Sequence, residues 1–388
     1  MTITFFPFNS YIPEIESFLS KLSGVPVKVG QIRVETWPRA SLALNDVRIG
    51  REKSNTRFDE IQVIPEFASI LSHRKILREV VLRGTNLTPE RFTLLSSIVA
   101  IVNSQNSDVS VKRFRFENAD ITYAGLSFPE MFGEVNLGAN RAFESFSMKT
   151  ADSNLLIDVK PIILGGHRIS FERYGWRPGA GAPTFRMINA KGNLLNDVFT
   201  IDSLEILIFD GIFHGKGVMQ LSDGKPRFQG SADFERINTT AFGALFGVGQ
   251  HLSGEAFGQA SFSTTAASWS GIFREQLDVN GEFEVRRGYF QGIDLAGAVR
   301  QTSDVPFRGG ETIFEQLSGK VRTVPGGVSF TELQMSSGLL QSSGALTLNR
   351  EKVLNGVMYL QMRGSMARTR TPIHINGTLD ALTAQIGN

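Results

Sequence analysis

The feature that most constrains the fold is a two-residue alternation of apolar and polar side chains along most of the chain. Phe114 and Phe116 alternate with arginines, and Met358, Leu360 and Met362 show the same pattern near the C-terminus. Such alternation is typical of strands with one buried face and one exposed face. Because these segments are short and separated by glycine, with few helices between them, they predict a mainly β fold.

Helical periodicity is confined to a few segments. Residues 10–24 have Ser10 as a candidate cap, Pro13 in the first turn and Gly24 as a stop, so they predict an N-terminal helix. A second helix is expected over residues 89–103, and short helices are expected near 67–71, 239–246 and 294–301. The apolar face of the first helix is formed by Ile12, Ile15, Phe18, Leu19 and Leu22.

One stretch, EFEVRRGYFQGIDLAGAVRQ at residues 282–301, combines several of these signals. It begins as a strand with Phe283 and Val285 on its apolar face, turns at a glycine and continues as a short helix. Asp294 opens that helix and is expected to be its N-cap, although a catalytic carboxylate is the alternative. The neighbouring pair Arg286-Arg287 is either a phosphate site or, more simply, part of a solvated strand face.

Composition adds an unusual aromatic bias. The 388-residue chain has 30 Phe but 5 Tyr and 3 Trp, together with 39 Gly. One interpretation is a β-rich core with many turns. The other is an apolar surface for a ligand without hydrogen-bonding groups, such as acyl chains. The sequence leaves both open.

Several classes of function lack support in the sequence. The net charge of +2 gives no electrostatic footprint for nucleic acid, and the absence of cysteine excludes disulfides and thiol chemistry. The five histidines have no metal-binding spacing, and neither a GxSxG nor a Walker motif is present, so we expect no metal, no cofactor and no enzymatic activity. The glycine-spaced FGALFGVG at 242–249 fits helix packing better than a dinucleotide site.

A weak internal repeat is also present. GIFHGKGVMQL (211–221) and GLLQSSGALTL (338–348) share two glycines and a leucine in register. Each follows an apolar strand-like segment, which suggests a strand–glycine–strand unit built twice into one sheet.

Taken together, ordered motifs at both ends of the chain resemble the AsmA-like family of bacterial envelope proteins. The resemblance covers residues 10–85 and 235–388, with the middle of the chain only compatible. That family has a membrane-spanning helix directly before the region that begins here with FPFNSYIPEIE, and this chain lacks it. The matching segments are LSGVPVKVGQI (22–32), Trp37-Pro38, LALNDVRIG (42–50), FEVRRGYFQGIDLAGAV (283–299), TIFEQLSG (312–319), SSGALTL (342–348) and IHINGTLDA (373–381).

The resemblance implies a long, curved antiparallel sheet, taco-like, with an apolar inside, an N-terminal helix and short capping helices. It implies three segments: 1–103 and 238–388 as AsmA-like ends, and 104–237 as a middle β-groove. It places the protein in the periplasm, anchored to the inner membrane by the missing helix. Its implied role is to carry phospholipid toward the outer membrane, with acyl chains as ligand and with envelope proteins as further partners.

Strand phase gives the residues expected to line such a groove. Those in the apolar phase of their strands are Leu204, Ile206, Ile208, Phe283, Val285, Leu340, Leu346, Leu348, Met358, Leu360 and Met362. Two other functions stay open: a scaffold for outer-membrane protein assembly with a closed, dry β core, and a periplasmic hydrolase whose site the sequence does not reveal.

Overall fold

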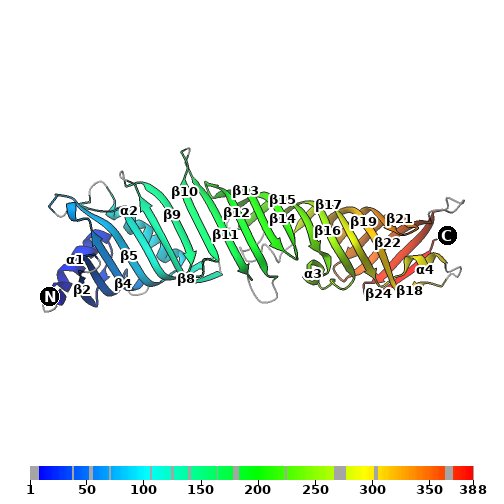
Figure 1. Ribbon diagram of the computed structural model, residues 1–388, viewed down its shortest axis with the longest axis horizontal. Helices are drawn as coiled ribbons and strands as arrows, with labels where there is room; N and C mark the ends of the chain where they lie inside the picture. Colours follow the sequence, from blue (N-terminus) through cyan, green and yellow to red (C-terminus); the bar gives the residue numbers. More distant parts are fainter. Residues whose placement is uncertain are drawn as a thin grey trace. The chain divides into compact units, whose positions relative to one another are not determined.

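The computed structural model describes residues 8–36, 39–51, 56–69, 71–104, 107–123, 126–138, 141–163, 165–177, 183–222, 225–265, 277–300, 305–362 and 370–387. Within these ranges the chain is mainly β, with 24 strands of one sheet, an N-terminal helix and a few short helices (Figure 1). This confirms the expected fold class. Of the motifs noted above, Trp37-Pro38 lies outside the described residues.

The chain divides into two compact units, Met1–Arg173 and Tyr174–Asn388, called unit 1 and unit 2 below. The expected segment boundaries, after residues 103 and 237, both fall inside these units and remain predictions.

Unit 1 begins with the 3-10 turn η1 (Phe8–Tyr11) and the helix α1 (Ile12–Ser23). Gly24 ends α1 in the left-handed conformation, with φ 71°, as its position predicted. Ser10, the expected cap, lies instead in η1, and Tyr11 precedes α1 without a side-chain cap.

The strands of unit 1 pair in the order β3, β4, β5, β7, β8, β9, β10 and β11, and β1 and β2 both pair with β3 at the free edge. Their bounds are β1 (Val27–Lys28), β2 (Gln31–Glu35), β3 (Ser41–Ile49), β4 (Thr56–Pro65), β5 (Lys75–Leu87), β6 (Val109–Val111), β7 (Arg113–Tyr123), β8 (Leu126–Leu137), β9 (Phe143–Thr150), β10 (Leu155–Pro161) and β11 (His167–Trp176), with the 3-10 turn η2 (Phe67–Ser69) after β4.

One connection in unit 1 departs from the expected antiparallel pattern. Strand β5 pairs in parallel with β6 and β7, and the helix α2 (Pro89–Val102) forms the crossover between them. A parallel pair requires such a long connection, because the chain must return to the same end of the sheet before the next strand starts.

Both helices of unit 1 cover one face of its sheet. Ile12, Ile15, Leu19 and Leu22 of α1 pack on a core built around Phe58 and Val47, which α2 also covers through Leu95 and Val102. The apolar face of α1 is therefore occupied by the core of its own unit. Phe18 was expected on that face but is 54% exposed, since the helix docks through the narrower stripe formed by the other four residues.

Unit 2 continues the antiparallel pattern from β12 to β17 and then through β19, β20, β21, β22, β23 and β24. Its strands are β12 (Phe185–Leu195), β13 (Val198–Ile208), β14 (Gly211–Ser222), β15 (Lys225–Asn238), β16 (Leu252–Thr265), β17 (Asp278–Gln291), β18 (Phe307–Arg308), β19 (Glu311–Val324), β20 (Gly327–Ser337), β21 (Leu340–Asn349), β22 (Val353–Met362), β23 (Thr371–Thr378) and β24 (Ala381–Ile386).

The C-terminal part of unit 2 curls until it nearly closes. Strand β24 pairs with the two-residue strand β18, which leads directly into β19. The helices α3 (Thr239–Ala244) and α4 (Leu295–Arg300) lie where two of the expected short helices were placed. Asp294 caps α4 as expected, because its Oδ1 accepts a hydrogen bond from the Gly297 N–H at 2.8 Å.

The internal repeat corresponds to two hairpins of unit 2. In β13–β14 and in β20–β21, the first strand carries a bulge and the second strand carries the shared glycine, Gly217 or Gly344. The repeated unit is thus a bulged strand, a tight turn and a glycine-bearing strand.

Candidate functional site

The register of unit 2 places all eleven expected groove residues on one face of the sheet, called the inner face below. Val285 pairs with Ala256 and Leu317, and the ladder from Leu317 runs through β20 and β21 to Leu360. In the other direction, the ladder from Ala256 leads to β13. The expected strand phase was therefore correct for both groups of residues.

Burial divides these residues into two kinds of environment. Val285, Leu340, Met358 and Leu360 are between 1% and 3% exposed and belong to a filled hydrophobic core with α4 and Phe314. Phe283, Leu346 and Leu348 pack at the margin of that core, whereas Met362 is 46% exposed. The inner face between β17 and β24 is thus a closed core rather than an open surface.

The inner face of β12 to β16 has a different construction. Its aromatic side chains are five half-buried phenylalanines, and these rings belong to neither hydrophobic core of the described residues. We call this surface the Phe–Gly floor; its paired residues are Ile188, Ala190, Gly192, Leu194, Phe199, Ile201, Leu204, Ile206, Ile208, Phe213, Gly215, Gly217, Met219, Phe228, Gly230, Ala232, Phe234, Ile237, Ala256, Gly258, Ala260 and Phe262.

Rings on the floor lie over glycines of neighbouring strands. A methyl group on Gly230 would be 3.0 Å from the Phe262 ring, and one on Gly258 would be 2.7 Å from the Phe234 ring. A methyl group on Gly217 would likewise be 3.2 Å from the Phe228 ring. Aromatic side chains that cover cross-strand glycines shield the backbone and pack along the sheet. These contacts explain why Phe and Gly occur together on β14, β15 and β16.

Adjacent rings also contact each other along the floor. The centroids of Phe228 and Phe262 are 5.1 Å apart, and those of Phe213 and Phe234 are 5.9 Å apart, both in tilted arrangements. These distances are in the range favoured by aromatic pairs. The ring contacts therefore run across three strands of the floor, β14 to β16.

Polar groups on this face occur only where the described strands end. Arg186 at the start of β12 and Thr264 near the end of β16 share the phase of the floor, and the floor residues between them are all apolar. A surface of this kind offers no hydrogen bond to a ligand, so it favours hydrocarbon over any polar molecule.

Unit 1 has a small apolar hollow of about 10 Å³ between side chains of β5, β7, β8 and β9. Four of its lining residues, Leu87, Phe116, Ala119 and Ile121, also belong to or pack against the core of unit 1, and no polar surface is exposed within it. Its lining residues are Leu87, Phe116, Ala119, Ile121, Met131, Phe132, Gly133, Phe146 and Met148.

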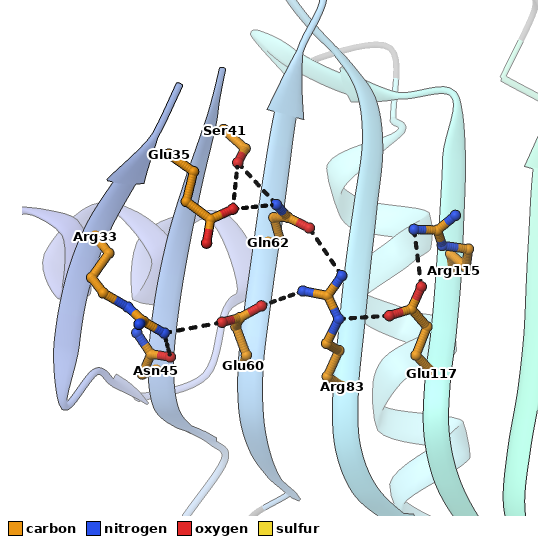
Figure 2. A network of polar contacts seen from close by, with 9 residues as sticks. All are labelled: Arg33, Glu35, Ser41, Asn45, Glu60, Gln62, Arg83, Arg115 and Glu117. Atoms are coloured by element: carbon orange, nitrogen blue, oxygen red, sulfur yellow. Dashed lines mark hydrogen bonds and ion pairs between the residues drawn. The ribbon is translucent and has the colours of Figure 1, made fainter. Parts of the chain in front are cut away.

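The opposite, outer face of unit 1 carries a cross-strand ladder of charges (Figure 2). Arg83 on β5 lies between Glu60 on β4 and Glu117 on β7, with its Nε 2.6 Å from a Glu117 carboxylate oxygen. Burial alone would lower the pKa of Arg83, but the hydrogen bonds and charges of Glu117 and Glu60 outweigh it and raise that pKa. This network pairs Arg83 with carboxylates on both neighbouring strands of the outer face.

In unit 2, the arginine pair singled out in the sequence also has internal partners. Arg286 lies 4.4 Å from the centre of the Phe257 ring, and Arg287 forms an ion pair with Glu255 at 2.7 Å. These contacts match a solvated outer strand face rather than a phosphate site.

Among the described residues, no group of His, Asp or Glu side chains forms a potential metal site. None of the helices in the described ranges is both long and apolar enough to cross a membrane. No protein-family model, curated protein or solved structure matches this chain.

The five phenylalanines of the floor were not among the residues expected from the sequence. They are Phe199, Phe213, Phe228, Phe234 and Phe262. Their signal was the spacing of Phe and Gly on alternate positions, as in FHGKG at 213–217, but the ring-over-glycine contacts join different strands and require the register.

Proposed function

We propose that this chain is a non-enzymatic lipid-binding protein that holds phospholipid acyl chains on the Phe–Gly floor. The observation that carries the proposal is the floor itself: an apolar surface across several strands, with half-buried rings that belong to neither core. Burying each CH₂ of an acyl chain there would contribute about 0.8 kcal/mol.

The motif resemblance to AsmA-like proteins extends this proposal to a location and a direction. On that basis the protein acts in the periplasm, anchored to the inner membrane in its full-length form, and supplies phospholipid for outer-membrane biogenesis. Envelope proteins at either membrane would be its partners.

A structural scaffold for outer-membrane protein assembly is the second candidate. It is favoured by the C-terminal core of unit 2, where Val285 and Leu360 are buried in a filled interior that leaves no room for a ligand. The two functions differ in one respect: a scaffold requires no bound lipid.

Mass spectrometry of an organic extract of the purified chain tests the proposed function. The proposal predicts phospholipid in amounts comparable to the protein, and its absence would favour the scaffold. Phe228→Asp should reduce the bound lipid because it places a charge on the floor. Gln229→Asp, the adjacent exposed position on the outer face, is the matched control and should retain the lipid.

A further inference from the structure

A cluster of exposed apolar side chains lies next to the end of the floor in unit 2. Phe242 of α3 contacts Phe209 and Phe246, with ring centroids 5.8 Å and 5.4 Å apart. Phe242, Leu245 and Phe246 are 42%, 43% and 61% exposed. We call Phe209, Phe242, Leu245 and Phe246 the α3 patch. Exposed apolar clusters of this kind are uncommon on a soluble surface without a partner.

Hydrogen bonds hold α3 and the turn after it in place. The Asn238 Oδ1 accepts a hydrogen bond from the Ala241 N–H at 3.1 Å and so caps α3, and the Thr239 hydroxyl donates to the Leu252 carbonyl at 3.0 Å. After the helix, Lys352 Nζ donates to the Gly247 carbonyl at 3.0 Å. The exposed rings therefore belong to a fixed element of the fold.

Close packing of two glycines also holds α3 against the turn that follows it. A Cβ on Gly243 would be 2.9 Å from the Cα of Gly249, so the turn after α3 lies directly against the helix. This contact explains the glycine spacing of FGALFGVG. It also leaves Leu245 and Phe246, between the two glycines, to face solvent.

The α3 patch is continuous along the chain with the floor. Phe209 directly follows the floor residue Ile208, and α3 directly follows Asn238, the neighbour of the floor residue Ile237. Beyond the floor, the filled core around Val285 and Leu360 closes the inner face. An acyl chain on the floor therefore has no apolar path farther toward the C-terminus, whereas the α3 patch extends the apolar surface at the strand ends.

We propose that the α3 patch is a membrane contact, where acyl chains pass between a bilayer and the floor. This inference rests on the proposed lipid-binding function. Its side chains carry no hydrogen-bonding groups, and the nearby charges, Lys352 beside Gly247 and Asp210 beside Phe209, have opposite signs. A neutral, purely apolar patch matches the acyl region of a bilayer better than a charged protein partner.

Flotation of the full chain with phosphatidylcholine vesicles tests this proposal. The double variant Phe242→Ser/Phe246→Ser should weaken vesicle binding at least about tenfold, because two large apolar side chains are lost. The single variant Phe246→Ser, at the most exposed position of the patch, should also weaken vesicle binding. It provides the test if the double variant does not fold. Ile313→Ser, a 65% exposed apolar residue of β19, is the control and should leave binding unchanged.

Lipid content, measured by mass spectrometry on the same samples, separates the two proposals. The membrane contact is supported when the patch variants lose vesicle binding and also carry less lipid than Ile313→Ser, because loading of the floor then requires the patch. It is overturned when the unmodified chain binds no vesicles, or when the patch variants bind them equally well. Vesicle binding that depends on Phe246 in a chain free of lipid would overturn the proposed function and leave the membrane contact standing.

Discussion

Phe262 of β16 lies over Gly230 of β15, so that a methyl group on Gly230 would be 3.0 Å from the ring and still closer to the Lys216 carbonyl oxygen of β14. The pair shows why the floor needs both residue types. The ring requires the space that glycine leaves, and glycine alone would leave the backbone unshielded.

This relationship predicts that Gly230→Ala lowers the free energy of unfolding by about 1–3 kcal/mol, because the added methyl group forces the ring or the neighbouring strand to move. Urea denaturation followed by circular dichroism measures the change. Ser231→Ala, the next residue on the outer face, is the matched control and should change stability by less than about 0.5 kcal/mol. Equal effects of the two substitutions would contradict the ring-over-glycine account.

The free edge of unit 1 leads to a second prediction. Side chains of η1 and α1 accept hydrogen bonds from main-chain N–H groups on or beside the edge strands β1 and β2: Asn9 from Ile32, Glu16 from Val29 and Ser20 from Val27, at 2.9 to 3.0 Å. Exposed edges invite pairing with other chains. Removing the acceptor at Glu16, in Glu16→Ala, should therefore increase aggregation, measured by light scattering, while Glu14→Ala on the exposed side of the helix should not.

The same carboxylate predicts a pH dependence. Burial raises the pKa of Glu16, but the hydrogen bond from Val29 and the charge of Lys28 outweigh it and lower the pKa below 4.5. The contribution of Glu16 to stability is thus complete above its unfolded-state pKa of about 4.3 and is lost as the pH falls through the lower folded-state value. Glu16→Gln should remove this part of the acid sensitivity. The midpoint of urea unfolding, measured from about pH 7 down to about pH 3, should fall less steeply for Glu16→Gln than for the unmodified protein. Parallel curves for these two proteins would show that the prediction is wrong.

The charge ladder of unit 1 gives a fourth prediction. Removing the Arg83 guanidinium leaves Glu60 and Glu117 facing each other across β5 without their shared cation. Because Arg83 is partly exposed, we expect Arg83→Met to cost about 1–3 kcal/mol, less than for a fully buried pair. Adding Glu60→Gln to this variant should recover part of the loss, and a double-mutant cycle measures that coupling. Strict additivity would show that the ladder is not an energetic unit.

A charged substitution should destabilise the C-terminal core of unit 2 more than the floor. Leu360 is 1% exposed, so Leu360→Asp places an unpaired charge in a filled interior and should prevent folding. Phe234→Asp lies on the half-exposed floor, where the charge reaches water, so the fold should survive. Thermal melts of both variants compare the two environments, and similar losses would indicate that the floor is also a closed core.

Much of this architecture can be predicted from the sequence where local pattern decides it. The C-terminal end of α1, the extent of α2, the Asp294 cap and the inward phase of Leu204 and Leu360 all follow from periodicity or capping residues, which depend on neighbours in the chain. Not every strand carries the alternation. In β5, buried Val80, Val81 and Leu82 follow one another without alternation, because the outer-face charge ladder covers that strand too.

The division of the inner face into a closed core and an open floor could not be predicted in this way. Both have the same alternation, and what separates them is the pairing of β24 with β18, a strand of two residues without a sequence signature. The ring-over-glycine contacts are equally non-local, because they depend on the register between strands that the alternation alone does not fix.

Site-specific crosslinking tests most directly whether the floor binds acyl chains. A photoreactive phenylalanine analogue at Phe213, on the floor, and at His214, the next residue on the outer face, would be illuminated in cells, and the purified protein analysed by mass spectrometry. The account predicts a lipid adduct at position 213 and none at 214. Equal labelling at both positions, or no lipid adduct at 213, would contradict it.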